Sequence, residues 1–85
     1  MIVMGIDPNP KDSGYAYWDA GAQRVISHGL VLNIDLLHIL RSGRPICNAD
    51  RIAIERVRSY GQVLGNDTID TVEWYGGFWR AATVP

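Results

Sequence analysis

Two acidic residues that each follow a short apolar run are the residues of this sequence best placed to do chemistry together. Asp7 comes directly after residues 2–6, and Glu55 comes directly after residues 51–54. Two carboxylates held side by side repel each other unless a cation lies between them. Mg²⁺ and Mn²⁺ prefer such oxygen ligands and also bind phosphate oxygens. Two of these ions, about 4 Å apart, can activate a water and stabilise the leaving oxygen in phosphodiester cleavage.

A structural alternative gives each acid an ordinary role. Asp7 would begin a turn, which is a common position for aspartate. Glu55 would pair at the surface with Arg56 or Arg58, which follow it closely. The spacing of the residues alone leaves both interpretations open.

For the two acids to meet, the runs before them must form neighbouring strands. Residues 2–6 show no polar alternation, which predicts a strand covered on both faces. Turn-forming residues fill positions 8–13, and a second strand is predicted to begin at Gly14, where small residues alternate with tyrosines. A third strand over residues 24–32 follows a short connection, so the second and third strands are predicted to form an antiparallel hairpin.

Two helices complete the predicted order of elements. The first has Asn33 as its N-cap, and Gly43 marks its end. The second begins near Asn66, after a fourth strand at residues 51–55. Four residues of this second helix lie along one side of it: Ile69, Val72, Gly76 and Trp79.

The predicted order is strand, strand, strand, helix, strand, helix. A helix between the third and fourth strands permits a crossover, so the fourth strand can lie parallel to the first. The fold class is therefore α/β with a mixed sheet. Both strands would end at the same edge of that sheet, where open α/β sheets bind ligands, and Asp7 and Glu55 would lie side by side there.

Length and composition indicate a small soluble domain. The chain has 85 residues, 47% of them hydrophobic and 20% charged, which fits a single domain over residues 1–85. The formal net charge of -1 argues against a strongly basic surface for nucleic acid, although bound cations would offset carboxylates. The single cysteine, the absence of a signal sequence and the absence of a long apolar run favour a cytoplasmic protein without a membrane partner.

The motifs around the two acids resemble those of the RuvC family of Holliday-junction resolvases. The resemblance lies in Gly5-Ile6-Asp7-Pro8, in Ser13-Gly14-Tyr15 and in Ile52-Ala53-Ile54-Glu55-Arg56. Further runs look closer to small RuvC-like proteins of phages and prophages: Ser59-Tyr60-Gly61, Gly65, and Thr71-Val72-Glu73-Trp74 with Phe78. The resemblance extends over nearly the whole chain.

This resemblance implies an RNase H-like fold and a metal-dependent endonuclease that acts on branched DNA such as a four-way junction, usually as a homodimer. The cell would be bacterial or phage-infected. Asp7 matches the ligand on the first strand and Glu55 the ligand on the fourth strand of a Mg²⁺ or Mn²⁺ site. The two acids are therefore the expected catalytic and metal-binding residues.

The family pattern also includes a fifth strand and a C-terminal helix with one or two further acids, and the sequence ends before both. The expectation is therefore an RNase H-like domain that is incomplete at its C-terminus, binds divalent metal weakly and cleaves DNA poorly or not at all. A fourth strand without its neighbour would expose an edge that invites self-association.

Four further residues near the acids are candidates for contacts with DNA. Lys11, Arg56 and Arg58 could contact phosphates, and Tyr60 could stack on an unpaired base. The alternative is solvated surface charge for the three cations and packing on the sheet for the tyrosine. His28 and His38 have no partner ligands in metal spacing and are predicted to be structural.

Two other functions remain as alternatives. An actin-like nucleotide-binding module also places an acid on its first strand, but Pro8 and Pro10 remove two backbone donors from the loop that would face phosphate. A non-catalytic remnant that binds DNA or only assembles would agree with the missing acids.

Overall fold

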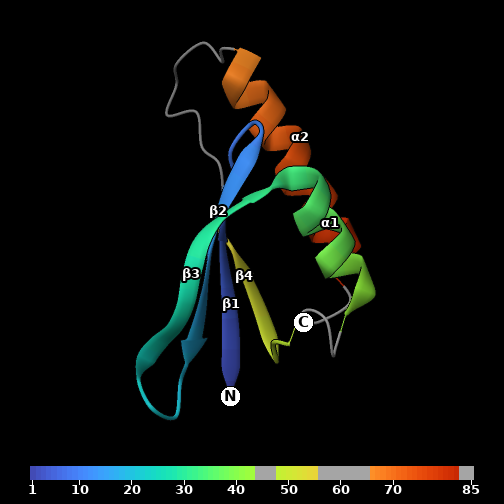
Figure 1. Cartoon of the computed structure of the whole chain (residues 1–85). Coiled ribbons are helices and arrows are strands. Elements are labelled where there is room, and N and C mark those ends of the chain that lie inside the picture. The colour runs from blue at the N-terminus through green and yellow to red at the C-terminus, as the bar shows by residue number, and fades with distance from the viewer. Residues whose placement is uncertain (44–47, 56–65, 83–85) are drawn as a thin grey trace.

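The computed structural model describes residues 1–43, 48–55 and 66–82. Its elements in chain order are β1 (Ile2–Asp7), β2 (Asp12–Asp19), β3 (Arg24–Leu32), α1 (Asn33–Ser42), β4 (Arg51–Ile54) and α2 (Asn66–Ala81). This order confirms the predicted strand, strand, strand, helix, strand, helix arrangement. The four described strands form one sheet in the order β3-β2-β1-β4 (Figure 1).

The pairing of the strands brings the ends of β1 and β4 to the same edge. β1 pairs antiparallel with β2, and β2 pairs antiparallel with β3, which confirms the hairpin. β4 lies parallel to β1, with Gly5 opposite Ala53 and Ile6 opposite Ile54. β2 begins at Asp12, two residues before the predicted start at Gly14, because Asp12 already pairs with β3.

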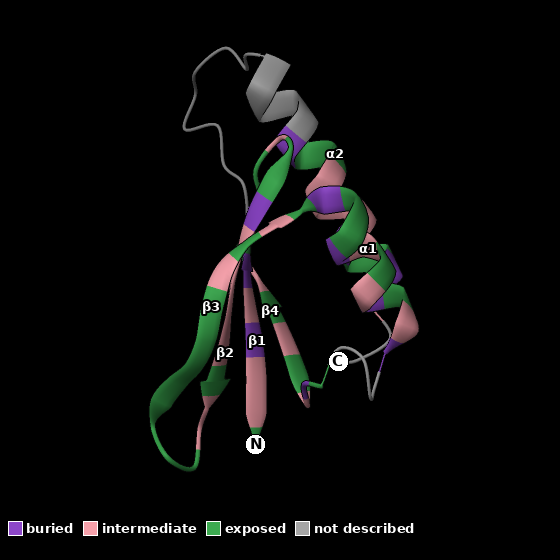
Figure 2. Ribbon diagram, viewed as in Figure 1, coloured by how far each residue is buried: buried purple, intermediate pink, exposed green. Residues whose placement is uncertain are grey.

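Both described helices pack on one face of the sheet (Figure 1). Met4 and Ile6 of β1 are buried against Leu36 and Leu40 of α1 and Phe78 of α2. The buried positions in Figure 2 gather where the helices meet the strands. Because successive side chains of a strand point to opposite faces, the intervening positions of β1 point away from the helices, and none of the described helices covers that face. The prediction that β1 is covered on both faces is wrong for the described residues. We call this uncovered side the open face.

The buried side of α2 differs from the predicted one. Phe78 is 0% exposed, and its ring lies 5.7 Å from that of Trp74. Thr71 and Ala81 are buried on the same side, whereas Val72 and Trp79 are exposed. Phe78 and Trp74 pack into the core formed with β1 and α1, so the side of α2 that carries them faces the sheet.

Asn33 is the first residue of α1 and does not cap it with its side chain, contrary to the prediction; the N-cap position is Leu32. The buried Asn33 instead joins α1 to the connection between β1 and β2. Its Nδ2 donates to the carbonyl of Asn9 (2.7 Å), and its Oδ1 accepts from the hydroxyl of Ser13 (2.5 Å). Its backbone N–H donates to the carbonyl of Lys11 (2.8 Å). We call these three hydrogen bonds the Asn33 tether.

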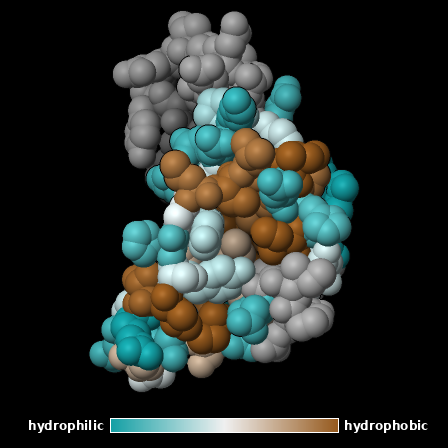
Figure 3. All heavy atoms as spheres, in the orientation of Figure 1, coloured by the Kyte–Doolittle hydropathy of each residue, from teal (hydrophilic) through white to brown (hydrophobic). Residues whose placement is uncertain are grey.

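The apolar residues of the β2–β3 hairpin are largely exposed. Figure 3 shows hydrophobic surface over this part of the molecule. The exposed large side chains include Trp18, Val25, Ile26, Leu30 and Leu32. None of the described helices is long and apolar enough to cross a membrane.

Candidate metal and nucleic-acid site

Asp7 is the last residue of β1, and its side chain points to the open face. Its partner in the register is Gly14 of β2, and a Cβ added at Gly14 would lie 3.5 Å from the Asp7 Cβ. The absence of a side chain at Gly14 therefore leaves the Asp7 carboxylate accessible from the β2 side. Asp7 is exposed, so an ion or a ligand in solution can reach its carboxylate.

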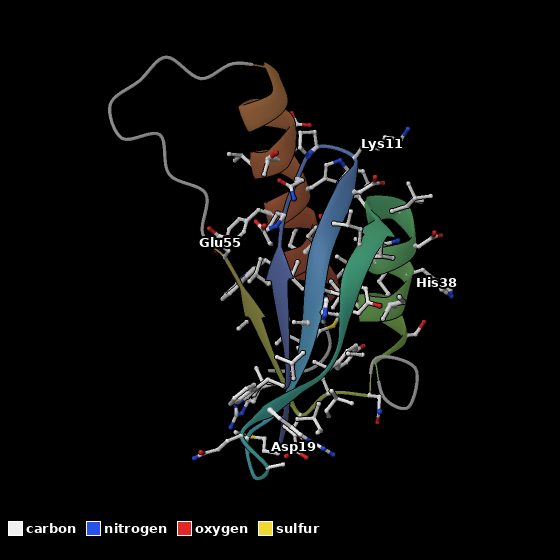
Figure 4. All side chains as sticks on the ribbon, turned by 60° about the vertical axis from the view of Figure 1, so that its left-hand side comes forward. Lys11, Asp19, His38 and Glu55 are labelled. Carbon is white, nitrogen blue, oxygen red and sulfur yellow. The ribbon has the colours of Figure 1, made fainter. Side chains whose placement is uncertain are left out.

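Glu55 is brought next to Asp7 by the parallel pairing of β4 with β1. The Glu55 N–H donates to the carbonyl of Ile6 (2.8 Å), which continues the ladder one residue beyond the end of β4. Glu55 therefore follows Ile54 just as Asp7 follows Ile6. Figure 4 shows Glu55 at this end of the sheet, with Asp19 at the opposite end. The predicted juxtaposition of the two acids is present in the structure.

The two carboxyl groups interact directly. The Asp7 carboxyl raises the pKa of Glu55 above its ordinary value, mainly through a hydrogen bond between the two side chains, then through charge repulsion, and least through burial. A proton or a bound cation at this place would offset the repulsion between the two carboxylates.

The donor set fits Mg²⁺ or Mn²⁺, which prefer oxygen ligands. Mg²⁺ is commonly held by one or two carboxylates, with waters and substrate phosphates as its other ligands. The described residues contain no group of three or more His, Cys, Asp and Glu side chains that could hold a metal ion. Asp7 and Glu55 thus offer a partial ligand set that a phosphate group would complete.

A shallow hollow of about 380 Å³ lies on the open face beside Asp7. Its floor includes Gly5, Gly14 and Ala16, and His28 lines it as well. The register explains the grouping: Gly5 of β1 lies opposite Ala16 of β2, which lies opposite His28 of β3. The sequence showed small residues alternating with tyrosines in β2, but it did not show that His28 belongs to the same row.

The other predicted site residues are distributed as follows. Lys11 is exposed in the connection between β1 and β2, and Figure 4 shows it apart from Glu55. Arg56, Arg58 and Tyr60 lie outside the described residues. His38 lies on α1, which packs on the other face of the sheet from the hollow.

Two solved structures are similar to this chain over its whole length. RuvC of Thermus thermophilus in complex with a Holliday junction substrate aligns with a TM-score of 0.63 and 24% identity, covering 100% of this chain and 63% of that one. A structure of Thermus thermophilus RuvC aligns with a TM-score of 0.60 and 22% identity, covering 100% of this chain and 61% of that one. The chain has the RuvC fold.

The RuvC fold confirms the predicted RNase H-like mixed sheet with two helices. The chain spans about 63% of the length of the RuvC structure with the junction. No protein-family model matches the sequence, and a search of the curated proteins found no match. The similarity at this level of identity concerns the fold, and the site rests on the geometry of Asp7 and Glu55.

The raised pKa of Glu55 predicts a dependence of stability on pH in metal-free protein. A group whose pKa is higher in the folded than in the unfolded state stabilises the fold at low pH, and that contribution is lost as the pH rises through the folded pKa. We expect the melting temperature of the wild type to fall, as the pH rises above the ordinary pKa of a glutamate, by more than that of Glu55→Gln, which has no second carboxylate to repel Asp7.

Thermal melts in a chelator at several pH values test this expectation. Glu73→Gln, at an exposed glutamate of α2, is the matched control and keeps the Asp7–Glu55 pair. Equal pH dependence in the wild type and Glu55→Gln would contradict the interaction of the two carboxyl groups.

Proposed function

We propose that this chain belongs to a metal-dependent endonuclease of the RuvC type, which hydrolyses phosphodiester bonds in branched DNA. The observation that carries the proposal is the contact between Asp7 and Glu55 at the ends of two parallel strands, on the open face of a RuvC fold. The RuvC structure with a Holliday junction substrate supports branched DNA as the class of substrate.

In this proposal Asp7 and Glu55 would hold Mg²⁺ or Mn²⁺ with their carboxylate oxygens. The bound ion supplies Lewis acidity toward the phosphodiester and favours the ionised form of water. The protein positions the two ligands. The backbone hydrogen bond from the Glu55 N–H to the Ile6 carbonyl holds Glu55 beside Asp7 in the metal-free protein. Both carboxyl groups must be ionised to hold the cation, so metal affinity would decrease as the pH is lowered.

With only two carboxylate ligands, several coordination positions of the ion remain for water and phosphate oxygens. We therefore expect weak binding of Mn²⁺ to the free protein and tighter binding when DNA is present. Linkage requires the reciprocal effect, so Mn²⁺ must raise the affinity for DNA by the same factor.

Titrations of Mn²⁺ and Mg²⁺ with a four-way junction, a linear duplex and ATP test the proposal. A nuclease of this type binds the junction more tightly than the duplex, in a metal-dependent way, and cleaves it. Tight binding of ATP with no effect of DNA would favour the actin-like nucleotide-binding module and contradict the proposal.

Binding of DNA without cleavage is a second candidate function. It is favoured by one observation, which is that no third acid joins Asp7 and Glu55 in the described part of the chain. Metal-dependent binding of the junction with no cleavage in Mg²⁺ or Mn²⁺ would support this function in place of the first. Lys11 and, outside the described residues, Arg56, Arg58 and Tyr60 remain proposed DNA contacts in both cases.

We also propose that the chain forms a homodimer. In the described residues β4 pairs only with β1, so its other edge offers unpaired backbone groups to a second copy. Light scattering over a wide dilution series is expected to show a dimer that dissociates on dilution. A monomeric mass at every concentration would contradict this assembly.

A further inference from the structure

His28 shares the hollow on the open face with Asp7. It is exposed on β3, two strands away from Gly5 in the same row of the sheet. Asp7 and Gly14 occupy the next row. Asp7 and His28 thus both line one shallow hollow, which has a volume of about 380 Å³.

The floor between them carries only small residues. Gly5, Gly14 and Ala16 give almost no side-chain height above the backbone. A glycine inside a strand weakens the strand and often marks a place where a ligand or another backbone approaches closely. A Cβ added at Gly5 would meet only the carbonyl of Ala16, at 3.9 Å, so the space above this glycine is open.

The two polar side chains of the hollow suit different parts of a nucleic-acid strand. The Asp7 carboxylate attracts a phosphate only through a cation that it binds. An imidazole N–H can donate a hydrogen bond to a phosphate oxygen without a cation. A DNA strand lying across the floor would therefore meet the metal site at one phosphate and His28 at another.

We propose that the hollow holds the sugar-phosphate backbone of the DNA strand next to the scissile phosphate, and that His28 donates a hydrogen bond to one of its phosphate oxygens. This inference rests on the proposed function for the identity of the ligand. His28 is then a positioning residue that contacts DNA and takes no part in bond cleavage, in place of the structural role predicted from the sequence.

The experiment measures binding and cleavage of a fluorescent four-way junction by four variants of the full chain. His28→Ala is expected to raise the Kd about tenfold, the effect of losing one hydrogen bond to a charged group. His28→Gln retains a side-chain N–H donor and should recover much of the affinity.

The matched control is His38→Ala, which removes the other histidine of the chain from α1, across the sheet from the hollow (Figure 4). It should bind the junction as the wild type does. Gly5→Val is an independent variant that fills the floor. Because valine favours strands more than glycine does, this variant should fold at least as well as the wild type and bind DNA more weakly.

The outcomes separate this inference from the proposed function. Wild-type binding by both His28→Ala and Gly5→Val, with cleavage still lost in Asp7→Asn, would overturn the role of the hollow and leave the nuclease in place. A wild type that binds DNA through His28 but never cleaves would overturn the nuclease only. If the two variants change the mass of the assembly and not the Kd for DNA, a second copy covers the hollow and the inference is wrong.

Discussion

Asp7→Asn is expected to abolish the metal-dependent interaction of this protein with branched DNA. The substitution removes a charged ligand and leaves one carboxylate, Glu55, to hold the ion. Loss of groups that only support metal ligands already lowers affinity or activity about 10- to 100-fold, so we expect a loss of at least about 100-fold for a ligand itself. Isothermal titration with Mn²⁺ in the presence of a four-way junction measures the affinity, and a gel assay measures cleavage.

The fold should survive this substitution. Asp7 is exposed, and asparagine has nearly the same shape as aspartate. The side chain of Asn9 donates to the backbone carbonyl of residue 7, which the substitution keeps. Metal-free Asp7→Asn should even gain stability, because it no longer repels Glu55.

Asp19→Asn is the matched control for the same change of charge. Asp19 lies at the opposite end of the sheet (Figure 4), where its carboxylate accepts from the N–H groups of Gly21 (3.0 Å) and Ala22 (3.2 Å). The amide oxygen of asparagine can accept the same bonds, so this control should retain metal-dependent binding. Equal loss in both variants would point to an effect of net charge and would contradict a metal site at Asp7 and Glu55.

Ser13→Ala is expected to lower the free energy of unfolding by about 1–3 kcal/mol, because it leaves the Oδ1 of the buried Asn33 without its hydrogen bond. Ser13 is 0% exposed; its hydroxyl donates to the Asn33 Oδ1 and accepts from the Asn9 N–H (3.2 Å). An 85-residue domain has a total stability of about 4–13 kcal/mol, so this loss is a large share. The melting temperature should fall by about 4–8 °C for each kcal/mol.

Ser42→Ala provides the matched control for the same loss of a hydroxyl. Its hydroxyl donates to the carbonyl of His38 (2.8 Å) at the exposed end of α1, where water can replace the bond. We expect a change within about 0.5 kcal/mol. Chemical denaturation of both variants and of the wild type measures the difference. Equal stability of Ser13→Ala and Ser42→Ala would show that the tether does not hold the β1–β2 connection to α1.

The tether also bears on the site, because the connection that it anchors begins at Asp7. The sequence indicated a cluster of turn formers between the first two strands and assigned Asn33 to a helix cap. Both predictions rest only on residues that are neighbours in the sequence. The structure joins positions that are 20 to 24 residues apart, and such a hydrogen bond has no signature in a local pattern.

The buried side of α2 was mispredicted for a related reason. Spacing along a helix shows which residues share a side, but it does not show which side meets the sheet. Val72 and Trp79 share a side, and so do Trp74 and Phe78. Packing against α1 and β1 selects the side that carries Phe78.

By itself the sequence determined the order of the elements and the meeting of Asp7 and Glu55. Apolar runs, turn formers and caps are local signals, and the handedness and length of the crossover then allow few arrangements. Only the tertiary structure decided which face of the sheet stays open and that His28 shares it with Asp7. Side chains alternate between faces at every residue of a strand, so the pairing register assigns each of them to a face, and that register depends on contacts across the whole sheet.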